Sequence, residues 1–251
     1  MQYWFRGLEP TDFVVGEDKP TEGFLFGDFD SRDSDWWLVS RDAPTPEENV
    51  ITETVPYMQG VYDFSMFQGE RFFGNRDITY KVFYSGSVYR DRKGFEQDIK
   101  RQLMPFGEQT LTDTHEEVYY WRGKCKSVEV EDTAGGMMAT IVFDCYPFAF
   151  TSHNEGADYW DDVYFPHWVW QETKYKVSAD QSITLYNLGS RPVPTSFEVT
   201  GKVTIKGKFG TVELTADNYA KTEIVLAMRA NKISLSGSGT ILFKFTREEM
   251  L

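Results

Sequence analysis

The sequence predicts a mainly β protein with two domains, the first of which carries one α-helix. Three observations support this prediction. Apolar and polar residues alternate with a period of two in many short segments, turn residues separate these segments, and a single segment has helical spacing. With 251 residues, the chain is long enough for one large all-β domain or two ordinary ones, and either can bury a core without disulfides or metal ions.

The charge of the chain is unevenly distributed, which favours two domains over one. The net charge of −13 divides into −12 for residues 1–147 and −1 for residues 148–251. An acidic first half argues against specific nucleic-acid binding, because such binding needs Lys and Arg against the phosphates. It suits a surface past which DNA slides without sticking. We find neither a signal peptide nor an apolar run near the roughly 20 residues that span a bilayer, so we expect no membrane insertion and no export.

In the first half, residues 61–66 and 78–84 alternate between polar and apolar and are predicted to be strands. Residues 42–48 are predicted to be a loop or an arm, because two prolines there lack the amide hydrogen that a strand ladder needs. The segment Gly94–Met104 is predicted to be a helix that ends before Pro105, since its apolar residues are spaced by four and basic residues lie in its last turns.

The most informative stretch runs from Val118 to Phe150. Two alternating segments flank the glycine pair Gly135-Gly136 there, which predicts a β-hairpin. Its second arm ends in the sequence Cys145-Tyr146-Pro147-Phe148, and a proline cannot continue a central strand. We therefore place a domain boundary after Pro147, with a first domain of residues 1–147 and a second of residues 148–251.

The two cysteines, Cys125 and Cys145, lie one on each arm of this predicted hairpin. A cross-strand disulfide is geometrically conceivable, although a chain of this size does not need one. Two buried free thiols, in a protein assembled in the cytosol, are the alternative.

The second half is predicted to be an antiparallel β-sandwich. Its alternating segments are short, and we interpret the glycines around them as turns. The predicted strands are residues 197–199, 202–205, 211–214 and 241–245. The glycines are Gly201, Gly207, Gly210, Gly237 and Gly239.

Taken in order, these blocks resemble the distal tail proteins, called Dit, of long-tailed siphophages and prophages. The resemblance extends from about Tyr62 to Arg247, whereas residues 16–49 form an acidic and aromatic insertion that departs from the family pattern. It rests on the order and spacing of Glu70–Tyr80, the pair Tyr119-Tyr120, Cys145–Phe148, Tyr186–Pro194 and Asn231–Thr240. It implies structural roles for Cys145, Tyr146, Pro147, Phe148, Asn187, Gly189 and Pro192.

The resemblance implies a virion structural protein that is not an enzyme and has no cofactor. It implies a homohexameric ring at the distal end of a non-contractile tail, with a ring-forming N-terminal (belt) domain and a galectin-like C-terminal β-sandwich. The implied partners are the major tail tube protein, the tail-tip or adhesion-carrying protein, and receptor-binding or upper-baseplate proteins. The ring would conduct DNA, and it would be assembled in the cytoplasm of the bacterial host.

Four residues of the first half are candidates for the subunit interface: Trp36, Trp37, Arg71 and Arg76. The side chains of Trp36 and Trp37 cannot both point inward if this segment is extended, because neighbouring residues in a strand face opposite sides. We therefore expect one of the two to contact another chain, since large exposed aromatics surrounded by charge mark interfaces. Arg71 and Arg76 belong to the arginine-containing strand of the family pattern.

A carbohydrate-binding module is the alternative function. Trp160, Trp168 and Trp170 lie within eleven positions, and the two-residue period of a strand would place Trp168 and Trp170 on one face. Two such rings could stack against the sugars of a host cell-surface glycan. Burial in the sandwich core or under the linker is the competing interpretation of these tryptophans.

The sequence gives no support for catalysis or for a metal site. Residues 28–35 are rich in aspartate but lack the Gly and the Glu that an EF-hand loop requires. His153 and His167 lie fourteen apart with no cysteine nearby, which fits no structural zinc site. We find no phosphate-binding loop, nucleophile elbow or zinc-protease motif. A hydrolase with two carboxylates in a cleft is a third interpretation, and the abundant acids single out no pair for it.

Overall fold

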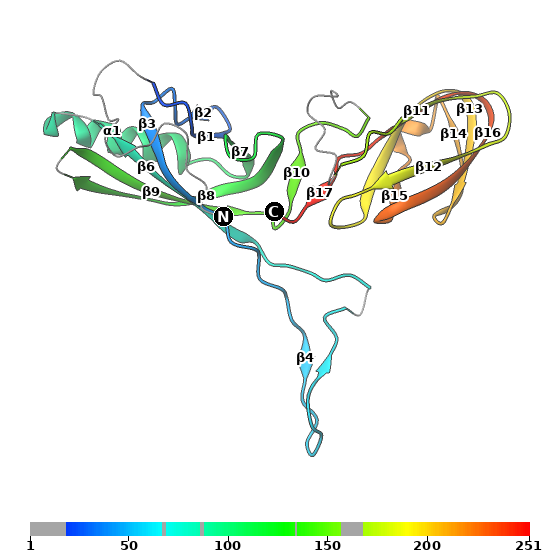
Figure 1. Cartoon of the computed structure of the whole chain (residues 1–251), viewed down its shortest axis with the longest axis horizontal. Helices are drawn as coiled ribbons and strands as arrows, with labels where there is room; N and C mark the ends of the chain where they lie inside the picture. Colours follow the sequence, from blue (N-terminus) through cyan, green and yellow to red (C-terminus); the bar gives the residue numbers. More distant parts are fainter. Residues whose placement is uncertain (1–18, 67–68, 86–87, 134, 157–167) are drawn as a thin grey trace. The chain divides into compact units, whose positions relative to one another are not determined.

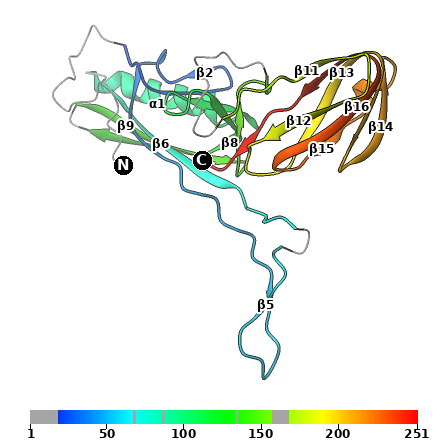
Figure 2. The same cartoon turned by 45° about the vertical axis from the view of Figure 1, so that its right-hand side comes forward.

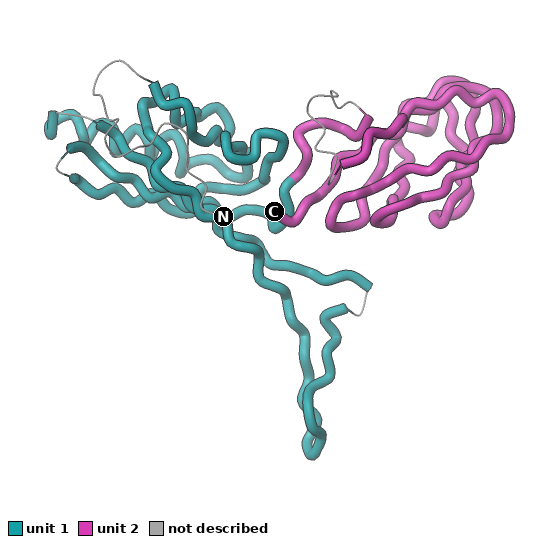
Figure 3. Tube along the Cα trace, viewed as in Figure 1, with its two compact units in different colours: residues 1–149 teal, residues 150–251 magenta. Residues whose placement is uncertain are grey.

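The computed structural model describes residues 19–66, 69–85, 88–133, 135–156 and 168–251 (Figure 1). These residues form antiparallel sheets with one α-helix, so the predicted fold class is confirmed. The chain divides into two compact units, Met1–Ala149 and Phe150–Leu251 (Figure 3). The division falls two residues beyond Pro147, and each unit is described by itself below.

Unit 1 is built on one antiparallel sheet with the strand order β2-β1-β7-β8-β9-β6-β3. The bounds of its strands are β1 Phe24–Phe26, β2 Phe29–Asp30, β3 Trp36–Asp42, β6 Arg76–Tyr84, β7 Gln109–Asp113, β8 Tyr119–Thr133 and β9 Gly136–Cys145. Strands β8 and β9 are the predicted hairpin, which is confirmed. Strand β9 ends one residue before Tyr146, where the aromatic and proline segment begins.

The core of unit 1 lies on the face to which alternate strand residues point. In β6, the residues Ile78, Tyr80 and Val82 are all buried, as the period of two requires. The ring of Phe24 stacks on Tyr80 with 4.7 Å between centroids, and Phe143 meets Phe24 edge-on at 5.5 Å. This aromatic cluster joins β1, β6 and β9 across the sheet.

The helix α1 (Tyr89–Leu103) packs against β8 and β9. It buries Ile99 and Leu103, which are four residues apart on one face, so the predicted helix is confirmed. It begins five residues earlier than the predicted Gly94. Its N-cap, Val88, makes no side-chain cap hydrogen bond, which explains why the sequence carried no start signal there.

Both cysteines are free and buried, so the alternative without a disulfide is confirmed. The register of the hairpin places Cys125 opposite Phe143 and Cys145 opposite Gly123, so the two sulfur atoms do not face each other. Burial raises the pKa of the Cys125 thiol to about 11 and that of Cys145 to about 12. Both thiols are therefore protonated and unreactive at neutral pH.

Unit 2 is an antiparallel β-sandwich with the strand order β11-β16-β13-β14, in which β12 also pairs with β16 and β15 with β13. The bounds are β11 Lys174–Val177, β12 Gln181–Asn187, β13 Val193–Gly207, β14 Gly210–Thr215, β15 Ile224–Leu226 and β16 Arg229–Lys244. Strand β10 (Ala149–Thr151) pairs with β17 (Glu248–Glu249), and neither belongs to the six-stranded sheet of the sandwich. A contiguous apolar core includes Val203, Leu235 and Phe243.

The glycines of unit 2 correct one part of the strand prediction. Gly207 and Gly210 do flank a two-residue turn, as expected. Gly201 and Gly239, however, lie inside the long strands β13 and β16, directly opposite each other. A Cβ on Gly239 would lie 1.9 Å from the carbonyl oxygen of Thr200, so only glycine allows these two backbones to approach. The predicted strands 197–199 and 202–205 are therefore one continuous strand.

Candidate functional site

The most distinctive feature of unit 1 is a hairpin arm, residues 43–75, which connects β3 to β6 (Figures 1 and 2). Its far part is the two-stranded ladder of β4 (Thr52–Glu53) and β5 (Tyr62–Asp63). The predicted loop or arm at residues 42–48 is the start of this feature. The predicted strand at residues 61–66 is not part of the domain sheet, because it returns along the arm and pairs only with β4.

The base of the arm is closed by Arg76, the first residue of β6. Its Nη2 atom donates a hydrogen bond to the carbonyl oxygen of Ala43 at 2.6 Å, so the two ends of the arm are tied together. Burial lowers the pKa of Arg76, and the neighbouring cation of Arg41 lowers it further. Arg76 is 3% exposed, which corrects its assignment to the subunit interface: its guanidinium serves the fold of its own chain.

A buried polar cluster fixes the strand from which the arm departs. The Nε atom of Arg41 lies 2.7 Å from Oδ2 of Asp113, and the hydroxyl of Tyr80 donates to the same oxygen at 2.5 Å. The other oxygen of Asp113 accepts the backbone N–H groups of His115 and Glu116. Burial and the nearby carboxylate together raise the pKa of Tyr80 well above its ordinary value, so the phenol stays a donor.

The near part of the arm is held by its own ladder. Glu48 and Phe73 form an isolated antiparallel bridge, and the N–H of Asn49 donates to the carbonyl of Phe72 at 2.8 Å. The guanidinium of Arg71 pairs with the carboxylate of Glu48 and lies over the ring of Phe73 at 5.3 Å. Arg71, a predicted interface residue, is thus exposed on the arm, where a charge pair adds little stability by itself.

The far part of the arm exposes an apolar surface. Half of the large hydrophobic side chains that are exposed among the described residues belong to the arm. They are Val50, Ile51, Val55, Tyr57, Val61, Tyr62, Phe64, Met66 and Phe72. An isolated two-stranded hairpin is at best marginally stable in water, and contiguous exposed apolar patches mark interaction sites. The arm therefore has the properties of a segment that another surface covers.

The predicted interface pair Trp36 and Trp37 is divided by the alternation of β3. Trp36 is 2% exposed and packs against the ring of Tyr84 at 5.5 Å, so it belongs to the core of its own chain. Its assignment to the interface was wrong, because the strand turns this side chain inward. Trp37 faces the opposite side of β3 and is half-buried. The proposal of an intersubunit contact now rests on Trp37.

The expected glycan platform is not present in the described residues. Trp168 and Trp170 do not lie in a strand, so the assumed two-residue period does not apply to them. Trp168 is 7% exposed beneath the guanidinium of Arg247, which lies 4.9 Å from its ring centroid, whereas Trp170 is 49% exposed. Trp160 lies outside the described residues. The two described tryptophans therefore do not present one flat surface to a sugar.

The residues for which the resemblance implies structural roles all lie within the described parts of the two units. Asn187 is fully buried, donates to the carbonyl of Arg191 at 2.8 Å and accepts the N–H of Gly189, so it closes the turn after β12. The carbonyl of Glu248 lies so close to Gly189 that a Cβ there would be 2.9 Å from its oxygen. Pro192, half-buried, follows directly before β13.

The segment after β9 supports the base of the arm. Cys145, Pro147 and Phe148 are buried, and the N–H of Tyr146 donates to the carbonyl of Arg122 at 2.8 Å. The ring of Phe148 meets that of Phe73, on the returning strand of the arm, edge-on at 5.8 Å. This contact was not evident in the sequence, because it joins residues 75 positions apart.

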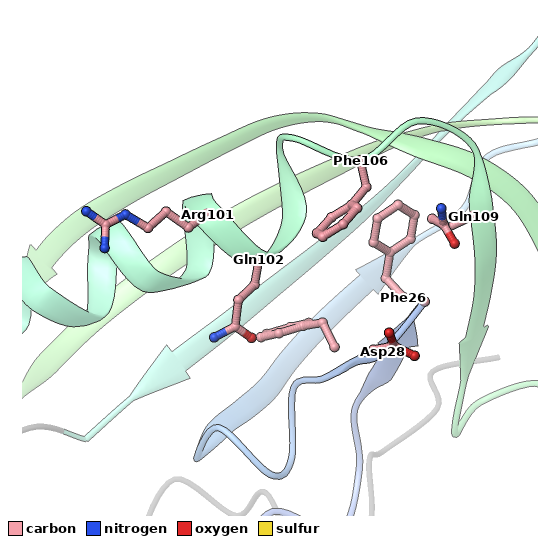
Figure 4. A pocket seen from close by; sticks show the side chains of 8 residues that line it. Phe26, Asp28, Arg101, Gln102, Phe106 and Gln109 are labelled. Atoms are coloured by element: carbon pink, nitrogen blue, oxygen red, sulfur yellow. The ribbon is translucent and has the colours of Figure 1, made fainter.

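A groove lies beside the C-terminal end of α1 and has a volume of about 310 Å³ (Figure 4). It forms between the β1–β2 turn, the end of the helix and the start of β7. Its lining residues are Phe26, Gly27, Asp28, Phe29, Arg101, Gln102, Phe106 and Gln109. The sequence did not predict this groove, because nothing in the local pattern connects residues 26–29 with residues 101–109.

Neither a metal centre nor a membrane-spanning helix is found among the described residues. They contain no group of three or more His, Cys, Asp or Glu side chains that could hold a metal ion. No helix among them is both long enough and apolar enough to cross a membrane. In unit 1, Arg41, Asp113 and Tyr80 are engaged with one another, and none of the three lines the groove beside α1.

The sequence matches no protein-family model and no curated protein. The structure, in contrast, is similar to the crystal structure of Dit of phage SPP1, described as a paradigm of the hub adsorption apparatus in phages that infect Gram-positive bacteria. The two chains are 12% identical, align over 90% of this chain and 98% of that chain, and have a TM-score of 0.64. The phage P2 baseplate in its activated conformation with Ca aligns with 8% identity over 92% of this chain and 98% of its own chain, with a TM-score of 0.42.

The fold is therefore a two-unit, mainly β fold shared with that phage protein, since the alignment with SPP1 Dit spans nearly the whole of both chains. Its particular form is the Dit fold. The resemblance to distal tail proteins drawn from the sequence is confirmed at the level of the fold.

Proposed function

We propose that this chain is a structural, non-enzymatic component of a phage tail tip. In this proposal, six copies form a ring at the distal end of a non-contractile tail and join the tail tube to the tail-tip or adhesion apparatus. The observation that carries the proposal is the arm of residues 43–75, whose apolar side chains have no core of their own. The Dit fold supports the same conclusion.

The arm is long enough to bind a neighbouring copy. If fully extended, the segment from Ala43 to Tyr57 would reach at most about 45 Å, which exceeds the ~30 Å diameter of a small domain. A ring needs a heterologous contact, in which one surface of a subunit binds a different surface of the next. An arm that reaches out from one subunit provides one half of such a contact. The half-buried Trp37, on the edge strand β3, is proposed to add to it.

The uneven distribution of negative charge along the chain supports the proposal that the ring encloses a channel that conducts DNA. Unit 1 carries almost all of the net negative charge, and six copies of residues 1–147 at −12 each would surround the channel with carboxylates. Screening limits this repulsion to about 8 Å at physiological salt, so it acts on DNA that passes close to the wall. Purified rings should retain no DNA at low salt. Tight retention would contradict this part of the proposal.

Unit 2, residues 150–251, is proposed to project toward receptor-binding or baseplate proteins. Carbohydrate binding, the alternative function, rests among the described tryptophans on the half-exposed Trp170. A glycan array with the full chain and with Trp170→Ala separates the two functions. Binding of a defined glycan by the parent chain, lost in the variant, would support the alternative.

Location in the virion tests the proposal directly. Antibodies raised against the full chain are applied to particles of the phage that encodes it, and the bound gold label is located by negative-stain microscopy. The proposal predicts label at the tail tip. Label on the capsid or along the tail tube, or a chain missing from purified particles by mass spectrometry, would overturn it.

A further inference from the structure

Strand β12 is an edge of the unit 2 sandwich and, unlike the other edge strands, carries no charge that would protect it. Among the described strands it pairs only with β16 (Figure 2). An open edge can pair with another chain, and proteins prevent this with charged residues, prolines or very short strands. Strand β11 has Lys174 and Lys176, β14 has Glu213, and β15 is three residues long. The seven residues of β12 include neither a charged residue nor a proline.

The side chain of Gln171 covers this edge in the way that a neighbouring strand would. Its Oε1 atom accepts the backbone N–H of Tyr186 at 2.8 Å, and its Nε2 atom donates to the carbonyl oxygen of the same residue at 2.7 Å. These are the two hydrogen bonds that a residue exchanges with its partner in an antiparallel ladder. By the alternation of the ladder, the backbone groups of Ser182 and Thr184 point toward the same edge.

A buried ion pair holds Gln171 in place. The Nε2 atom of Gln171 also donates to Oε2 of Glu155 at 2.8 Å, so both of its amide hydrogens are used. The other oxygen of Glu155 pairs with Nε of Arg247, and the two residues are 5% and 2% exposed. Removing one member of a buried ion pair leaves an uncompensated charge. The position of Gln171 therefore depends on Arg247.

Arg247 belongs to residues 246–251, here called the strap, which follows the sandwich strands. Arg247 is the buried residue of the strap, so polar contacts rather than an apolar core hold this segment. The backbone of Arg247 exchanges two hydrogen bonds of 3.1 Å with Thr151. Its guanidinium lies 4.9 Å from the ring centroid of Trp168 and 3.3 Å from a carboxylate oxygen of Glu249. Among the described residues, its Nε and Nη1 atoms make ionic contacts without hydrogen-bond geometry. Such a segment can detach while the sandwich core stays folded.

We propose that Arg247, Glu155 and Gln171 form a latch that keeps the edge of β12 closed to strand pairing, and that the excluded partner is β12 of a second copy. Two identical strands pair antiparallel about a two-fold axis, so the same surface meets itself. Because β12 has no charge, no like-charge repulsion opposes this pairing. Detachment of the strap removes the anchor of Gln171 and opens the edge. The inference does not depend on the proposed ring.

Hydrogen exchange of the full chain tests the latch. Gln171→Ala uncovers the edge directly, and Arg247→Met removes the cation but keeps most of the side-chain volume. Each should speed exchange of the Tyr186 N–H about tenfold, with no change in the core strands β13 and β16. The double variant should be no faster than Gln171→Ala, because both changes open the same edge. Arg191→Met is the matched control, since Arg191 pairs with Glu248 of the strap, outside the latch, and it should leave the exchange of Tyr186 unchanged.

Glu155→Gln repeats the test from the other member of the ion pair, with the side-chain volume unchanged. Two results in Arg247→Met and Glu155→Gln would overturn the inference. One is exchange of Tyr186 at the parent rate. The other is acceleration of Tyr186 by the same factor as β13 and β16, which would show that the edge opens only when the whole unit unfolds.

Light scattering identifies the partner. The full chain with Gln171→Ala should form a species of at least twice the mass of the parent assembly. Adding Ser182→Lys, which places a charge on the same edge, should return it to the parent mass. Thr211→Lys, on the edge strand β14, is the control and should leave the association unchanged. An unchanged mass of Gln171→Ala at every concentration, or association that persists with Ser182→Lys, would overturn the inference and leave the proposed function standing.

Discussion

Arg76 and Ala43 join the two ends of the arm through a partly buried hydrogen bond, from the guanidinium Nη2 to the carbonyl oxygen at 2.6 Å. We predict that Arg76→Ala lowers the free energy of unfolding of unit 1 by about 2 kcal/mol, because a charged hydrogen bond inside the protein is lost. Hydrogen exchange of residues 43–49 should accelerate. Arg71→Ala removes an exposed pair on the same arm and should leave the unfolding transition unchanged. Equal losses of unfolding free energy in Arg76→Ala and Arg71→Ala would contradict the role of Arg76 at the base of the arm.

The tryptophan pair is predicted to separate stability from assembly. Trp36→Ala should destabilise the monomer by about 3–5 kcal/mol, because it leaves a cavity beside Tyr84 in the core. Trp37→Ala should leave the melting temperature of the monomer within a few degrees of that of the parent chain. It should raise the concentration needed for ring formation about tenfold. Thermal unfolding and light scattering measure the two effects. Normal assembly of Trp37→Ala would remove this residue from the interface.

In unit 2, replacing one glycine with alanine is predicted to reduce stability strongly, because the added methyl group would meet the neighbouring strand. Gly239→Ala should destabilise unit 2 by about 3 kcal/mol or more, because its Cβ would overlap the carbonyl oxygen of Thr200 and force β13 and β16 apart. Gly210→Ala is the matched control, since Gly210 also has a positive φ, of 100°, but no atom lies within 4 Å of its Cβ position. Gly210→Ala should lower the free energy of unfolding by only about 1 kcal/mol. Denaturant unfolding of both variants decides between steric overlap and backbone strain alone.

Cysteine titration predicts how stability changes at alkaline pH. In the folded chain the thiol pKa values are raised from 9.0 to about 11 for Cys125 and about 12 for Cys145, chiefly by burial. Burial of the neutral thiols therefore stabilises the fold fully below about pH 9, and this contribution is lost as the pH rises toward 11 and 12. The unfolding free energy should fall more steeply above pH 9 for the parent chain than for a Cys125→Ala, Cys145→Ala variant. Parallel curves would contradict the burial of the thiols.

The second unit is predicted to fold without the first. Residues 150–251, expressed alone, should be soluble and unfold in one cooperative transition, because they contain a complete apolar core that includes Val203, Leu235 and Phe243. Calorimetry and near-UV circular dichroism test this. A fragment with strand content but no cooperative transition would show that the unit depends on the rest of the chain.

Local patterns in the sequence were enough to predict the fold class, the hairpin and the helix. Alternation and the Gly135-Gly136 pair determine the β8–β9 hairpin within a few residues, and the spacing of Ile99 and Leu103 determines the buried face of α1. Both signals act over short distances along the chain.

The remaining features depend on contacts between distant residues. Gly201 and Gly239 look like turn residues one at a time, and their role inside strands appears only when they face each other across β13 and β16. The sequence predicted the start of the arm at residues 42–48 but not its returning strand, because alternation within residues 61–66 does not show whether the far side of a strand meets a core or solvent. The α1 groove combines residues some 75 positions apart, so no local pattern could reveal it.

The mass of the chain in solution, measured by multi-angle light scattering over a range of concentrations and combined with negative-stain images, tests the central claim most directly. The account predicts a species of six times the 29.1 kDa of one chain and images with six-fold symmetry. A species of 29.1 kDa at the highest concentration, together with the absence of six-fold particles, would contradict it.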